Sequence, residues 1–114
     1  MTERKEMLLK LRKYVEEKKN VRHEYIDHTD EGTCYCAVGF LMNEVGFDLE
    51  NEEFIKNHNG DTIVSILGLY DLNHLKHIID GRELRRLQRL NDAAHRDDLI
   101  AYIDELMEVN EYDN

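Results

Sequence analysis

Apolar residues recur at the spacing of one helix face near both ends of the chain. The first set is Met7, Leu8, Leu11, Tyr14 and Val15, and the last is Leu99, Ile100, Ile103, Leu106 and Met107. A third set, Leu84, Leu87 and Leu90, follows the turn at Asp80-Gly81. Spacings of three and four residues place side chains on the same side of a helix. The pattern therefore predicts three amphipathic helices, the first of which is expected to end near Asn20.

The middle of the chain has a different pattern. Residues 36–45 are apolar on most sides, which is typical of a buried helix, and Gly46 is suited to end it. We expect this central helix to place Phe40 and Leu41 in the core. Upstream, residues 21–36 alternate between apolar and polar side chains around a polar turn at 27–32, which predicts a short β-hairpin.

The remaining segments are shorter. Residues 51–58 are expected to form a helix closed by Asn59-Gly60. Residues 61–67 fit a helix capped by Asp61 and also a strand, and residues 69–80 give no assignment. The chain contains no proline and no low-complexity linker. The predicted fold is therefore mainly α with a small β-hairpin, as a compact single domain over residues 1–114, whose acidic end (about 110–114) is a candidate for disorder.

The charge balance narrows the classes of partner. Lys and Arg number 15 and Asp and Glu number 25, so the net charge is −10. This charge disfavours nonspecific binding to nucleic acid or to an anionic membrane. No apolar stretch approaches the roughly 18 residues of a membrane span, and the charged N-terminus does not read as a signal peptide. We expect a cytoplasmic protein with a protein partner, and self-association remains open.

Cys34 and Cys36 are the first candidates for chemistry. A cysteine at a helix N-terminus has a lowered pKa, so either thiol could pair with His23 or His28 in a cysteine-dependent hydrolase or transferase. The favoured alternative is that they are packing residues where a strand enters a buried helix. The two cysteines lack the second ligand pair that structural zinc sites use, so no metal or other cofactor is expected.

Two charged surfaces are the other candidates. Arg82, Arg85, Arg86 and Arg89 form a stripe on the helix after Gly81, and with a break after Leu90 they suggest a helix-turn-helix nucleic-acid binder. The overall acidity favours a solvated or salt-bridged helix face instead. On the last helix, several acidic side chains are expected to point outward together and to bind a basic partner; these are Asp97, Asp104, Glu105 and Glu108.

The segment Tyr35-Cys36-Ala37-Val38-Gly39-Phe40-Leu41 resembles a motif of small, uncharacterised bacteriophage and prophage proteins, a pattern similar to C-C-L-G-V-L-C. Leu90-Asn91-Asp92 is similar to a second motif of that family, which precedes a final amphipathic helix. Ala37 and Met42 stand where the family has further cysteines, so thiol chemistry would be lost and packing kept. The resemblance and the charge together imply a non-enzymatic, phage-encoded accessory protein of the host cytoplasm. It would bind, and thereby inhibit, a host or phage protein through the acidic surface.

Overall fold

The computed structural model describes residues 2–17, 19–30, 32–93 and 95–108. Within these ranges the chain is mainly helical with one small antiparallel hairpin, which confirms the predicted fold class. The elements in chain order are α1 (Glu3–Glu16), β1 (Ile26–Thr29), β2 (Gly32–Tyr35), α2 (Ala37–Glu44), α3 (Glu52–His58), α4 (Ile63–Leu69), α5 (Asn73–Ile78), α6 (Gly81–Ala93) and α7 (Arg96–Glu108). The segment 110–114, predicted to be disordered, lies outside the described residues. None of the described helices is long and apolar enough to cross a membrane.

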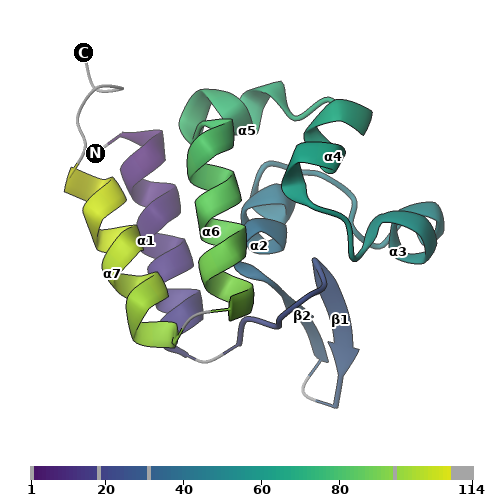
Figure 1. Cartoon of the computed structure of the whole chain (residues 1–114), viewed down its shortest axis with the longest axis horizontal. Coiled ribbons are helices and arrows are strands. Elements are labelled where there is room, and N and C mark those ends of the chain that lie inside the picture. The colour runs from purple at the N-terminus through teal and green to yellow at the C-terminus, as the bar shows by residue number, and fades with distance from the viewer. Residues whose placement is uncertain (1, 18, 31, 94, 109–114) are drawn as a thin grey trace.

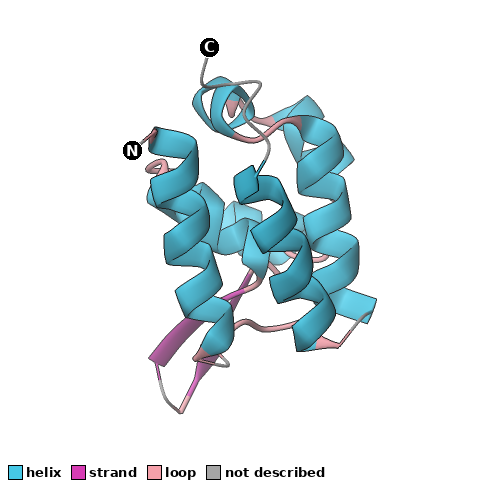
Figure 2. Cartoon of the chain, turned by 90° about the vertical axis from the view of Figure 1, so that its left-hand side faces the viewer, coloured by secondary structure: helices cyan, strands magenta, loops and turns pink. Residues whose placement is uncertain are grey.

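The three amphipathic helices predicted from periodicity are α1, α6 and α7. Figure 2 shows α7 between α1 and α6, and each of these pairs is in contact. Leu99, Ile103 and Leu106 of α7 are buried, as are Leu84 and Leu87 of α6. On the opposite side α6 packs against α4, so that α6 lies between α4 and α7 in the view of Figure 1.

The predicted central helix is α2, and it packs against both α1 and α6. Val38, Leu41 and Met42 are fully buried, which confirms this helix as the centre of the core. Phe40, predicted to lie in the core, is only partly buried; it packs against the core, and its ring stacks on Tyr14 with centroids 4.5 Å apart.

A close contact between backbones fixes the start of α2. Gly39 lies against the residue that precedes β1, and a Cβ added to it would sit 2.1 Å from the carbonyl oxygen of Tyr25. The amide of Cys36 donates to the same oxygen over 3.2 Å. Glycine is therefore required at position 39 because no side chain fits between the helix and this carbonyl.

The hairpin is shorter than predicted. β1 pairs with β2 from Ile26 opposite Tyr35 to Thr29 opposite Gly32, so the chain reverses between Thr29 and Gly32 and not over 27–32. Residues 21–24, expected to alternate as a strand, form no ladder, and His23 has a φ of +66°, outside the β region. The side chain of Asn59 binds both the amide and the carbonyl of Ile26, which covers the outer edge of β1.

Several predicted boundaries were wrong for local physical reasons. α1 ends at Glu16 and not near Asn20; the Asn20 side chain lies beyond the helix, where it donates to Asn91 over 2.9 Å. The helix over 61–67 is capped by Thr62 instead of Asp61, since the Thr62 hydroxyl accepts from the Ser65 amide. Residues 69–80, for which the sequence predicts no helix or strand, contain α5.

The helix-turn-helix break expected after Leu90 is also wrong. α6 continues through this segment to Ala93. Asparagine usually weakens a helix interior by competing for backbone hydrogen bonds. Here the Asn91 side chain points into the core, where the Ala37 amide and the Val21 carbonyl bind it, so it does not compete with the helix.

Candidate functional site

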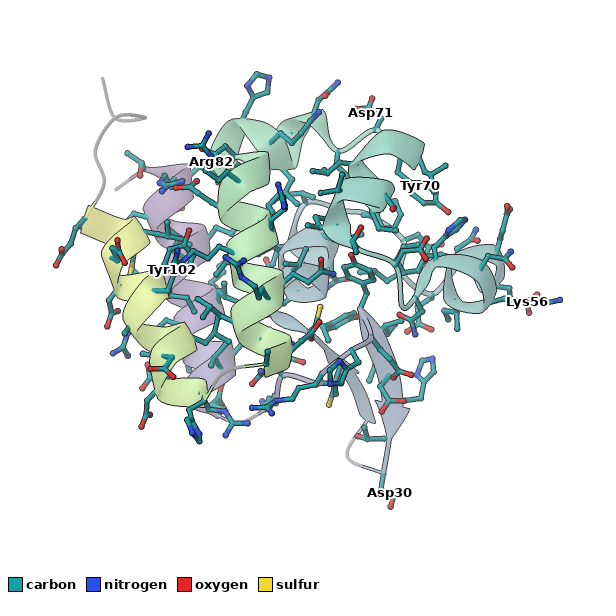
Figure 3. The ribbon with its side chains drawn as sticks, in the orientation of Figure 1. Asp30, Lys56, Tyr70, Asp71, Arg82 and Tyr102 are labelled. Carbon is teal, nitrogen blue, oxygen red and sulfur yellow. The ribbon has the colours of Figure 1, made fainter. Side chains whose placement is uncertain are left out.

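The outer face of α6 forms the floor of a groove with a volume of about 1020 Å³, which we call the arginine groove. Four exposed arginines lie along this floor, namely Arg82, Arg85, Arg86 and Arg89. We call this set the arginine stripe. The N-terminal residues of α4 form one wall of the groove and α7 forms the other. Figure 3 shows Arg82 near the N-terminal end of α6, and Tyr102 between α7 and α6.

The arginine stripe was expected to be solvated or salt-bridged. Within the described part of the chain, no carboxylate oxygen lies within 4.0 Å of a nitrogen of these four side chains. Three nearby carboxylates have other partners: Glu83 binds Arg4, Asp61 binds His58, and Asp92 accepts from the His23 amide. Among the described residues, the stripe therefore presents four exposed guanidinium groups with no carboxylate partner, on a chain that is acidic as a whole.

The walls of the groove are partly apolar. Val64 on α4 is 54% exposed, although its neighbours Ile63 and Ile66 are fully buried. On the other wall, the guanidinium carbon of Arg86 lies 5.0 Å from the centre of the Tyr102 ring, a cation–π contact. Burial raises the pKa of Tyr102. The sequence pattern predicts neither wall. With Thr62 as the helix cap, the helical repeat places Val64 outside the core.

The four acidic residues predicted to bind a partner do not all lie on one free surface. Asp97 and Glu108 are exposed on α7. Asp104 instead binds Arg12 of α1, with Nε–Oδ1 and Nη2–Oδ2 distances of 2.6 and 3.3 Å. Glu105 is exposed at the wall of the arginine groove. Of the four predicted residues, Asp97 and Glu108 remain as the acidic face of α7, and Asp104 joins α7 to Arg12 of α1 in an ion pair.

The two thiols differ in environment. Cys36 is buried and its sulfur accepts the Gly39 amide at 3.2 Å, so it serves as the N-cap of α2. Burial raises its pKa to about 12, the opposite of the lowering expected from a helix N-terminus. A cavity of about 20 Å³, room for about one water molecule, is lined by Cys36 together with His23 and Asp92. Cys34 is half-buried in β2, with the Thr29 hydroxyl 3.7 Å from its sulfur.

We expect Cys36 to react with a disulfide reagent at pH 8 at least about a hundredfold more slowly in the native protein than in denaturant. The raised pKa leaves almost no thiolate, the reactive form, and the sulfur is covered. The rate is measured in Cys34→Ser, which leaves a single thiol. Equal native and denatured rates would contradict the burial of this sulfur.

The six histidines and the acidic residues do not form a metal centre in the part of the chain that the structure describes. No group of three or more His, Cys, Asp or Glu side chains there is placed to hold a metal ion. His28, His58 and His74 each lie instead beside one carboxylate, of Glu50, Asp61 and Glu3 respectively.

Comparison of the chain with protein-family models, with curated proteins and with solved structures gives no match. The resemblance to phage proteins at residues 35–41 and 90–92 therefore stays a prediction.

Proposed function

We propose that this chain is a binding protein that acts without turnover, by docking an acidic segment of a protein partner in the arginine groove. The observation that carries the proposal is the arginine stripe: four exposed guanidinium groups with no carboxylate within 4.0 Å in the described structure, on a chain of net charge −10. Guanidinium groups bind carboxylates with two parallel hydrogen bonds, which favours an acidic ligand over a neutral one.

The surroundings of the arginine stripe favour a short acidic segment over nucleic acid. Asp61, Asp92 and Glu105 lie around the groove, and a long polyanion that follows the stripe would approach them. The net charge of −10 adds a long-range repulsion against a duplex. A protein segment carries its acidic groups over a limited length and avoids this cost.

The test uses a fluorescent 15-residue glutamate-rich peptide, its lysine-rich counterpart and a 15-base-pair DNA duplex, with binding followed by anisotropy. Arg85→Gln with Arg89→Gln is expected to weaken binding of the acidic peptide about two- to thirtyfold, from two exposed ion pairs at about 0.2–1 kcal/mol each. Added salt should weaken the binding as well. Lys13→Gln with Lys56→Gln is the matched control, since it changes net charge equally at exposed sites on α1 and α3.

The other outcomes contradict the proposal in different ways. Preference for the DNA duplex over the acidic peptide, lost in the arginine variant, would assign the groove to nucleic acid. Binding of the lysine-rich peptide alone, lost in Asp97→Asn with Glu108→Gln, would return the function to the acidic face of α7. An equal loss of affinity in the lysine control would show that only net charge matters.

A further inference from the structure

We infer that the segment which occupies the arginine groove is an amphipathic α-helix, with carboxylates at i, i+3 or i+4, and i+7 and an apolar residue beside them. The inference rests on the proposed function and names the class of ligand more closely. It draws on three features of the groove: the spacing of the arginines, the exposed apolar wall, and the acidic residues that limit its length.

The spacing of the stripe matches a second helix. Arg82, Arg85 or Arg86, and Arg89 follow one another at three or four residues, so they span about two turns, or about 10.5 Å along α6. A helix lying along α6 repeats at the same interval, and each of its three carboxylates can meet one arginine. An extended chain places side chains on one side about every 6.8 Å, twice the strand rise, and falls out of step with the turns of α6.

The apolar side chains on the walls of the groove indicate that the ligand also carries an apolar residue. Val64 is 54% exposed on one wall, and the Tyr102 ring is half-buried on the other, against Arg86. A helix that carries only acidic residues would leave Val64 in water. A helix with an apolar residue next to its acidic stripe would cover Val64 while its carboxylates reach the arginines, a combination that helix-in-groove complexes use.

Charge also limits the length of the acidic stripe on the ligand. Beyond Arg89, the next residue of α6 that faces the groove with a charge is Asp92, and Glu105 stands on the α7 wall. A fourth carboxylate one turn further along would meet Asp92 and be repelled. The acidic stripe of the ligand is therefore about two turns long, flanked by neutral or basic residues at the end that lies over Asp92.

Two synthetic peptides of identical composition test the inference. The first is a helix-forming peptide with Glu at i, i+4 and i+7 and Leu beside them, and the second contains the same residues in an order that removes the stripe. We expect the ordered peptide to bind about two- to thirtyfold more tightly, because the scrambled one can satisfy about one arginine at a time. Val64→Ser should weaken the ordered peptide at least about threefold and leave the scrambled peptide unaffected.

Circular dichroism of the complex gives a second readout, since the ordered peptide should gain helix on binding. Equal affinity of the two peptides, with no effect of Val64→Ser, would overturn the helix while leaving the proposed function intact if Arg85→Gln with Arg89→Gln still weakens both. Failure of both peptides to bind, or binding indifferent to the arginines, would overturn the proposed function as well.

Discussion

Replacing Arg4 with methionine is expected to lower the free energy of unfolding by about 3–5 kcal/mol, the usual cost of removing one partner of a buried ion pair. The Arg4 side chain is 5% exposed and binds both carboxylate oxygens of Glu83, over 2.9 and 2.8 Å. The same guanidinium donates to the backbone carbonyls of Ile78 and Leu106, so one side chain joins α1 to α5, α6 and α7. Without it, Glu83 would keep a buried charge with no cation.

Urea denaturation of Arg4→Met and of the double variant Arg4→Met with Glu83→Gln separates the charge from the packing. Glu83 also accepts the Asp80 amide while Asp80 accepts the Glu83 amide, a reciprocal cap at the start of α6. Glutamine keeps this cap and removes the charge. The double variant is therefore expected to recover a large part of the lost stability. If it were as unstable as Arg4→Met, the cost would lie in lost packing and hydrogen bonds and not in an unpaired carboxylate.

Arg4 also shows where sequence reasoning stops. The periodic apolar residues of α1, α6 and α7 were predicted correctly because each helix buries one face, and that face is visible in the local spacing. In the sequence, Arg4 is one of several Lys and Arg residues near the N-terminus, and its surroundings do not set it apart from the others. Its burial depends on Glu83, which lies 79 positions later in the chain and closes the pair only in the tertiary structure. No local pattern distinguishes such an arginine from an exposed one.

For the short helices α4 and α5 the limit is different: the sequence leaves α4 open between helix and strand and does not predict α5. They contain 7 and 6 residues, too few to show a helical repeat twice. Thr62, Ile63 and Val64 are good strand formers, so propensity opposed the helix that forms at 63–69. Packing of Ile63 and Ile66 against the core, with Thr62 as the cap, outweighs that propensity. The wall of the arginine groove depends on this helix, so the stripe was predictable and the groove was not.

The two motifs singled out in the sequence meet in space. Asn91, from Leu90-Asn91-Asp92, is 1% exposed, and its Oδ1 accepts the amide of Ala37 from the first motif over 3.0 Å. Its Nδ2 donates to the carbonyl of Val21 over 2.8 Å. Both motifs therefore join the loop before the hairpin, the start of α2 and the end of α6. These contacts hold the fold together, whereas the arginine groove lies on the outer face of α6, away from them.

Gly39→Ala should be among the most damaging single substitutions in the chain, with a loss of about 4 kcal/mol or more in the free energy of unfolding. The added Cβ would lie 2.1 Å from the Tyr25 carbonyl oxygen and 3.0 Å from its carbon, and both are backbone atoms that cannot rotate away. Relief requires α2 to move from the residue before β1, which would break the bond from the Cys36 amide to the same oxygen.

Gly68→Ala is the matched control, because Gly68 also lies inside a helix, α4, and a Cβ there would meet nothing within 4 Å. Alanine is the better helix former, so this change should raise stability by about 0.5–1 kcal/mol. Thermal and urea denaturation of both variants measure the contrast. The native reactivity of Cys36 gives an independent local readout, since displacement of α2 should expose its capping sulfur. A Gly39→Ala protein as stable as the wild type, with Cys36 still unreactive, would mean that α2 and the Tyr25 carbonyl are not in contact.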